Sequence, residues 1–192
     1  IFNGDGYSAE WEEEAARRGL PNNKNTVDAL KCLKDEKNLE MLDRLGVYSR
    51  VELGSRYEIL LDNYIKTIQV EGLTALKMAR TQLYPAVCDY LSKVSSEIVA
   101  AKEAGVPVEF LTDDANKLAG LIKTMKDQME TLDKNITDAQ AMDAEIFEQA
   151  VAWRDNVFGE MQALRATTDT IETLVDDEYW PVPSYIDLLF GI

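Results

Sequence analysis

The feature that most constrains the fold is a run of apolar residues at helical spacing in the second half of the chain. Its members follow one another at intervals of four and three residues: Leu118, Ile122, Met125, Met129, Leu132 and Ile136. This alternation is a heptad seam, which gives a helix one apolar stripe and requires a neighbouring helix to cover it. We therefore expect Ile122 and its neighbour Leu121 in a core between packed helices.

The first quarter of the chain predicts three short helices. Ser8 is a good N-cap for a helix over residues 9–18, since its hydroxyl can accept a hydrogen bond from a backbone N–H of the first turn. Two more short helices are expected over 27–33 and 36–45, and Thr26 is expected to open the first of these two.

A long helical pattern follows a capping box formed by Ser49 and Glu52. Gly72 and Pro85 interrupt this pattern. Because proline lacks the N–H that a helix needs and crowds the preceding turn, we expect a kink near Tyr84. The apolar positions of the pattern are Leu53, Tyr57, Leu60, Tyr64, Ile68, Ala75, Ala79 and Leu83.

Three more helical segments complete the prediction. The long pattern resumes over 87–104, a helix capped by Thr112 carries the heptad seam, and a last pattern runs over 138–177. Thr137 and Gln140 form another capping box, which marks either a short turn at Asn135 or a direct continuation from one helix into the next. As one unbroken helix this last segment would be about 60 Å long, whereas a compact sphere of this chain length is about 42 Å across. Strand-type alternation is short throughout. The sequence therefore predicts an all-α fold: an elongated antiparallel helical bundle with long helices.

The C-terminal segment 179–192 differs in composition from the helices before it. It reads Y-W-P-V-P-S-Y-I-D-L-L-F-G-I, with two prolines and no polar face. Leaving so much apolar surface in water is unfavourable. We therefore predict a docked tail in which Trp180 and Phe190 contact apolar surface, either on the same bundle or on a neighbouring domain or subunit.

The charge of the chain excludes several function classes. Twenty Lys and Arg residues face 35 Asp and Glu residues, for a net charge of −15. Nucleic acids and anionic membrane surfaces attract cationic proteins, so neither is expected as a partner. Residues 138–178 alone carry eleven acids and two arginines, which is typical of a solvated face and, less often, of a surface that binds a basic partner.

Histidine is absent and cysteine is rare. Without histidine the chain cannot form a Ser-His-Asp triad, the usual zinc sites or a histidine-containing di-iron bundle. The two cysteines, Cys32 and Cys88, form no disulfide framework and are expected to be inert thiols in a reducing compartment. The sequence has no apolar run long enough to span a bilayer and no leader-like start. We therefore expect a cytoplasmic protein.

Acidic runs are the remaining candidates for chemistry. Runs occur at 12–14, 113–114 and 176–178. A hard cation requires six or more convergent oxygens, so the first two are interpreted as partners of helix dipoles and the third as a solvated face.

One loop copies part of a calcium-binding motif. Asn3, Asp5, Gly6 and Glu12 match the third, fifth, sixth and twelfth positions of that motif, but Ile1 at the first position cannot ligate a cation. We interpret the loop as a turn. No catalytic, cofactor-binding or metal-binding residue is assigned in the chain.

Several longer stretches carry a family resemblance. The opening F-N-G-D-G-Y-S-A-E-W with A-A-R-R-G-L-P-N resembles the stretch after the catalytic barrel of type III glutamine synthetases. S-R-Y-E-I-L-L-D-N-Y-I-K-T-I-Q-V-E-G-L-T and L-Y-P-A-V are similar to the helical C-terminal region of that family, and W-P-V-P-S-Y-I-D-L-L-F is similar to its terminus. L-P-N-N-K-N-T-V-D-A-L-K also resembles the last segment of glutamine synthetases in general.

The resemblance implies two parts and a longer parent enzyme. Residues 1–46 would close the catalytic region and residues 49–192 would form the type-specific helical bundle, with the apolar tail 179–192. The parent would be an ATP-dependent glutamate–ammonia ligase using Mg or Mn, with its metal and nucleotide ligands upstream of this chain. It would assemble as stacked hexameric rings. The fragment itself would be a non-catalytic structural and assembly domain that contacts its own catalytic domain and neighbouring subunits, and it would hold no cofactor.

A different class of function stays open. The chain begins at Ile1 without an initiator Met, which suggests a piece of a longer protein. If a start codon instead lies at or near Ile1, the chain would be a free-standing acidic helical module for protein–protein interaction. The coding sequence upstream of Ile1 discriminates the two. A metal-binding bundle enzyme is disfavoured by the missing histidines.

Overall fold

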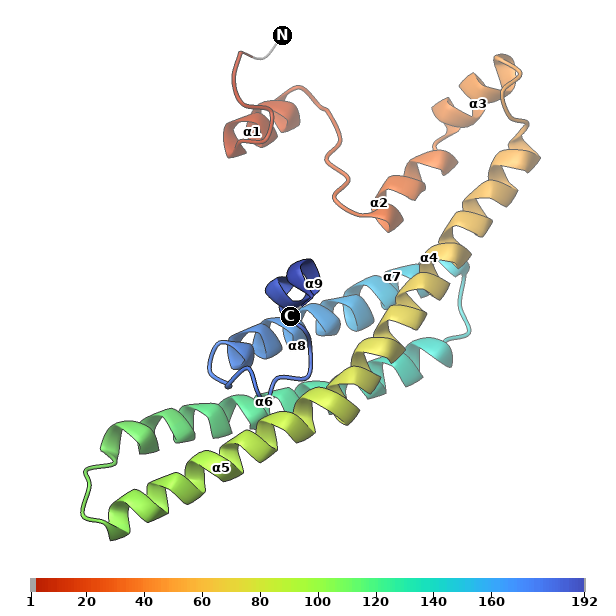
Figure 1. Cartoon of the computed structure of the whole chain (residues 1–192). Helices are drawn as coiled ribbons and strands as arrows, with labels where there is room; N and C mark the ends of the chain where they lie inside the picture. Colours follow the sequence, from red (N-terminus) through yellow and green to blue (C-terminus); the bar gives the residue numbers. More distant parts are fainter. Residues whose placement is uncertain (1–2, 192) are drawn as a thin grey trace. The chain divides into compact units, whose positions relative to one another are not determined.

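The computed structural model describes residues 3–191 and is all-helical, with no β-strand in that range (Figure 1). The all-α prediction is confirmed. The chain divides into two compact units, residues 1–64 and 65–192, and the division falls inside the long helix α4 (Arg50–Met78). Among the described residues, none of the helices is both long and apolar enough to cross a membrane.

The first unit consists of short helices followed by the first half of α4. In chain order these short helices are α1 (Ala9–Arg17), α2 (Thr26–Lys31), the 3-10 turn η1 (Cys32–Lys34) and α3 (Glu36–Arg44). They match the three short helices that the sequence predicts.

Side-chain caps fix where these helices begin. The Ser8 hydroxyl accepts a hydrogen bond from the Trp11 N–H at 3.3 Å, as predicted. At α2 the N-cap is Asn25, whose side-chain carbonyl oxygen accepts a hydrogen bond from the Asp28 N–H at 2.9 Å. Because the Asn25 side chain satisfies this N–H of the first turn, Thr26 is the first helical residue.

The capping box at the start of α4 is confirmed. The Ser49 N–H donates to the Glu52 carboxylate at 2.8 Å, and the Glu52 N–H donates to the Ser49 hydroxyl at 3.3 Å. Not every apolar position of the predicted pattern is in the core: Leu60 is exposed, and the fully buried residue is its neighbour Leu61.

The second unit takes the end of α4 and all later helices. These are the π-helical segment η2 (Ala79–Leu83), α5 (Tyr84–Glu103), α6 (Glu109–Gln140), α7 (Ile146–Ala152), the π-helical segment η3 (Trp153–Phe158), α8 (Gly159–Glu172) and α9 (Tyr185–Phe190).

The junction of α4 and α5 shows how the chain accommodates Pro85. The helix widens into η2 immediately before the proline and then continues as α5. Proline has no N–H to donate and its ring crowds the carbonyl group of the preceding turn, and the helix is wider in this π-helical segment than in a regular α-helix. The interruption expected at Gly72 is wrong, because α4 continues through this residue.

The long helix α6 is the centre of the second unit. All six seam residues from Leu118 to Ile136 are buried, which confirms the heptad prediction, while Leu121 is half-buried. On one side α6 packs against α5, and on the other against η3 and α8 (Figure 1). Short connections separate α5 from α6 and α6 from α7, so neighbouring long helices run antiparallel.

The expected start of α6 is wrong. The helix begins at Glu109, and the Thr112 hydroxyl donates to the Val108 carbonyl at 2.9 Å instead of capping the helix. At its other end α6 has no turn at Asn135: it continues directly through Thr137 and stops at Gln140. The last predicted pattern, over 138–177, thus begins within α6. The rest of its helical part is divided among three successive segments, α7, η3 and α8.

The predicted division of the chain at residues 46–49 remains a prediction. The contact-based division lies further along the chain, after Tyr64, but compactness does not report where a catalytic region would end. The elongated shape also remains a prediction.

Candidate functional site

The calcium-like loop is used for local hydrogen bonds and ion pairs. Asp5 accepts a hydrogen bond from the Tyr7 N–H at 2.9 Å. Glu12, the other carboxylate of the motif, pairs with Lys24 at 3.1 Å. Ile1 lies outside the described residues. Across residues 3–191, no three side chains of the His, Cys, Asp or Glu type gather where they could hold a metal ion.

The other acidic runs are also engaged locally or exposed. Glu14 pairs with Arg17 and with Arg18 on α1. Asp113 and Asp114 are exposed on the second turn of α6. In the third run the Asp176 carboxylate accepts from the Glu178 N–H at 3.0 Å, a turn contact. Glu12 lies in the first turn of α1, as a partner of the helix dipole should. For Asp113 and Asp114 the dipole interpretation is wrong, because α6 begins at Glu109 and both lie beyond its first turn.

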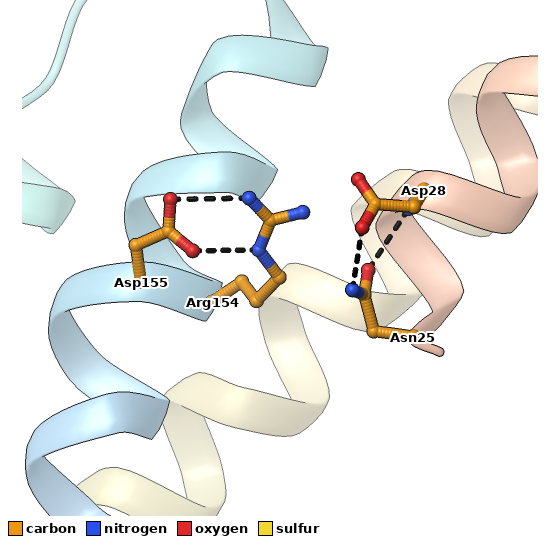
Figure 2. A network of polar contacts seen from close by, with 4 residues as sticks. All are labelled: Asn25, Asp28, Arg154 and Asp155. Carbon is orange, nitrogen blue, oxygen red and sulfur yellow. Dashed lines mark hydrogen bonds and ion pairs between the residues drawn. The ribbon is translucent and has the colours of Figure 1, made fainter. Parts of the chain in front are cut away.

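Each compact unit carries a well-formed polar pair of its own (Figure 2). On η3 the guanidinium of Arg154 donates two hydrogen bonds to the Asp155 carboxylate, at 2.6 and 3.1 Å, and lowers the pKa of that carboxyl. At the start of α2 the Asn25 side-chain amide donates to Asp28 at 2.6 Å. Such pairs order a helix surface, and neither places a nucleophile or base in a cavity.

The two thiols lie far apart in sequence and are both half-buried. Cys32 accepts a hydrogen bond from the Asn23 side-chain amide at 3.4 Å. Neither cysteine is in a disulfide.

The C-terminal tail is the most distinctive surface of the second unit. Tyr179 packs against Tyr90 of α5 with ring centroids 5.4 Å apart, and the Lys93 ammonium lies 5.1 Å from the centre of the Tyr179 ring. Trp180 is half-buried, and its indole N–H is buried without an acceptor among the described residues. The start of the tail is therefore docked on the helices.

The end of the tail forms a helix that sequence reasoning missed. The Ser184 hydroxyl accepts from the Asp187 N–H at 3.3 Å, and the Asp187 carboxylate accepts from the Ser184 N–H at 2.7 Å, a complete capping box. The Ser184 hydroxyl, which donates to the Asp187 carboxylate at 2.7 Å, and the Ser184 N–H together lower the pKa of Asp187. The signal was present in the sequence, because Ser-x-x-Asp directly before apolar residues is a capping pattern.

This helix, α9, exposes all of its large apolar side chains. Their exposed fractions range from 62% to 83%, and the residues are Tyr185, Ile186, Leu188, Leu189 and Phe190. Phe190 therefore does not dock on the described part of this chain, and its docking on a neighbouring domain or subunit stays a prediction. An apolar helix left in water marks a surface that another molecule or domain can cover.

Beside α9 lies a groove of about 620 Å³ within the second unit. Its polar rim carries the Arg165–Asp169 ion pair, at 3.3 Å, and Glu172. Its walls are mainly apolar and include Met78 and Leu83 near η2, Leu164 of α8, and Trp180, Tyr185 and Leu188 of the tail. Together the groove and α9 form the candidate site, and the chemistry they offer is apolar binding.

Comparison with known proteins shows which family the chain resembles. The family model described as "Glutamine synthetase C-terminal domain" matches residues 1–102. The chain is 34% identical over 194 aligned positions, covering all of it, to a glutamine synthetase of Butyrivibrio fibrisolvens. It is 31% identical to a glutamine synthetase of Bacteroides fragilis (strain YCH46) and 30% identical to the type-3 glutamine synthetase of Dictyostelium discoideum, over 98% and 99% of the chain.

The chain is much shorter than these relatives. It spans 28% of the protein from Butyrivibrio, 27% of that from Bacteroides and 26% of that from Dictyostelium. Similarity therefore runs through the whole chain but corresponds to about a quarter of each relative.

Proposed function

Because this chain belongs to the glutamine synthetase C-terminal domain family, we propose that it is the non-catalytic structural and assembly domain of a glutamine synthetase. The parent enzyme would make glutamine from glutamate and ammonia with hydrolysis of ATP, and its ATP and Mg or Mn would bind outside this chain. It would be a cytoplasmic oligomer of stacked hexameric rings.

One observation carries this proposal. The chain resembles glutamine synthetases along essentially its whole length while spanning only about a quarter of each. Identity of 30–34% over 98–100% of the chain supports the same place in a glutamine synthetase for this segment. The resemblance implies that the family's metal and nucleotide ligands lie upstream of this chain, and it assigns no catalytic residue to a position here.

The structure supports an assembly role over a catalytic one. The largest feature of the candidate site is an apolar groove beside an exposed apolar helix. Surfaces of this kind bind other protein surfaces, whereas a ligase that uses ATP must place cations and metal-bound carboxylates around phosphate groups.

The catalytic part of the proposal is tested with the purified chain. We expect no glutamate-dependent ATP hydrolysis at any Mg²⁺ or Mn²⁺ concentration, with the full-length type-3 enzyme of Dictyostelium discoideum as the positive control. Turnover by the 192-residue chain above a preparation of the tag alone would contradict a non-catalytic role.

The assembly part is tested in the same full-length relative. Deleting the segment that matches this chain should reduce the number of subunits per particle, obtained from the mass measured by light scattering divided by the mass of one shortened subunit, and should lower activity along with it. A deletion enzyme with an unchanged number of subunits and unchanged activity would rule out an assembly role. The free-standing interaction module remains the alternative, and the reading frame upstream of Ile1 decides between them.

A further inference from the structure

We propose that α9 and the neighbouring groove are the two halves of a self-association surface, in which α9 of one copy of this chain occupies the groove of a second copy. The inference deepens the proposed assembly role and rests on it for its biological setting. The surfaces that carry it belong to the second unit of the chain alone.

Both halves of the surface are apolar and lie side by side. The five large side chains of α9 are mostly exposed, and Tyr185 and Leu188 also line the groove. A helix that forms one edge of a groove can pair with its counterpart about a twofold axis, so that each α9 enters the groove of the other copy. Such an isologous contact uses the same patch twice and closes on itself.

The charge distribution favours a second copy at this place. The chain as a whole has a net charge of −15, which opposes contact between copies over most of the surface. Residues 179–192 contain a single charged side chain, Asp187, and its carboxylate is held by the Ser184 capping box. On the groove rim Asp169 is paired with Arg165, so among the described residues Glu172 is the one rim carboxylate without an ion pair. Copies can therefore meet here with less like-charge repulsion than the net charge alone implies, at a patch rich in Tyr, Trp and Phe, as the centres of protein interfaces are.

The available area is sufficient for a stable pair. Burying an apolar side chain of this size removes on the order of 100 Å² from water. With five such side chains on each α9, and comparable surface lost from each groove, the pair would bury roughly 2,000 Å² in total, at the upper end of the range of about 1,200–2,000 Å² for standard interfaces. The groove volume of about 620 Å³ is that of a site able to take several large side chains.

The first experiment measures the mass of the 192-residue chain in solution. Sedimentation equilibrium from about 1 to about 100 μM, the range that brackets weak to moderate affinities, should show conversion from monomer to twice that mass. A chain that stays monomeric throughout this range would overturn the proposal, and α9 would then be left for a different protein surface to cover.

Two single substitutions test the two halves separately. Leu189→Asp places a charge on α9, and Met78→Lys places one on the groove wall, where Met78 is 37% exposed. Each should raise the dissociation constant at least about tenfold. Val99→Asp, on the exposed surface of α5 away from the groove, is the matched control and should leave the dissociation constant unchanged. Circular dichroism and melting curves check that all three remain folded.

A mixture of the two variants gives the decisive readout. In either homodimer both α9–groove contacts carry the damaging charge. In the mixed pair one α9–groove contact is wild type on both sides. The other contact places the carboxylate introduced at position 189 against the ammonium introduced at position 78. The mixture should therefore dimerise more tightly than either variant alone. Variants that dimerise like wild type, or a mixture that dimerises no better than its components, would refute exchange of α9.

The dimerisation measurements and the turnover assay test different claims. Glutamate-dependent turnover by the chain would refute the proposed function while leaving the dimer in place. A monomeric chain without turnover would refute this inference while leaving the proposed function in place.

Discussion

A Cβ atom placed on Gly72 would lie 3.1 Å from Cγ1 of Val157 and 3.4 Å from Cδ1 of Ile136. Gly72 is thus the point where α4 approaches η3 and α6 so closely that even a methyl group would push the Val157 side chain away by a few tenths of an ångström. The residue that the sequence marks as a helix breaker is a contact point between three helices in the second unit.

Gly72→Val should therefore destabilise the second unit. Extra methyl groups in a packed contact typically cost about 1–3 kcal/mol, and valine is no better than an average residue in a helix. Thermal unfolding followed by circular dichroism measures the effect. Gly120→Ala is the matched control, because Gly120 is an exposed helical glycine of the same unit with nothing within 4 Å of its Cβ position. It should stabilise the protein by up to about 1 kcal/mol, and an equal gain at both sites would show that Gly72 is not tightly packed.

The seam of α6 gives a second prediction. Leu132 is fully buried, so Leu132→Asp should lower the free energy of unfolding by about 3–5 kcal/mol, the cost of burying an unpaired charge. Thr131→Asp, one residue earlier on the exposed side of the same helix, should change it by less than about 0.5 kcal/mol. A wild-type melting curve for Leu132→Asp would disprove the packing of the seam.

How far the sequence predicts this fold depends on the range of the interactions involved. The heptad seam and the Ser49–Glu52 capping box depend on spacing within one helix, and both were predictable. The start of α6 was not, because Thr112 has the chemistry of a cap but the helix begins earlier, at Glu109, without a side-chain cap. A cap pattern shows where a helix can begin, and tertiary packing decides whether it begins earlier.

The π-helical segments and the candidate site show a second limit. A π-helical turn adds one residue to a turn and so rotates the apolar face of the helix that follows. It is stabilised by packing between helices, as at Trp153 and Val157, which are buried within η3, and helical periodicity alone does not reveal it. The apolar character of the tail was predictable from composition, but the groove beside it depends on side chains from α4, η2 and α8 that are distant in sequence.

The attachment of the tail gives a third prediction. Tyr179 contacts the Tyr90 ring and the Lys93 ammonium. Aromatic pairs are worth about 0.5–1.5 kcal/mol and exposed cation–π contacts about 0.5–1 kcal/mol. Tyr179→Ala should accordingly lower the stability of the second unit by about 1–2 kcal/mol in chemical denaturation.

Tyr7→Ala is the control for this measurement, because the Tyr7 side chain is fully exposed. Deleting residues from Tyr179 onward should lower stability as well, or change the oligomeric state. If the deletion alters neither property, the tail is dispensable to this chain.

The last prediction concerns pH and the capping box of α4. Hydrogen bonds from the Ser49 N–H and hydroxyl hold the pKa of Glu52 below its ordinary value. A carboxyl whose pKa is lower in the folded than in the unfolded state stabilises the fold above the unfolded pKa, and this contribution disappears as the pH falls through the folded pKa. Carboxyl carbon NMR should therefore show Glu52 titrating at lower pH than in an unstructured peptide. Ser49→Ala removes the hydroxyl donor and should move the Glu52 pKa part of the way back, since the backbone donor remains. An unchanged Glu52 titration in that variant would mean that the Ser49 hydroxyl does not bind the carboxylate in solution.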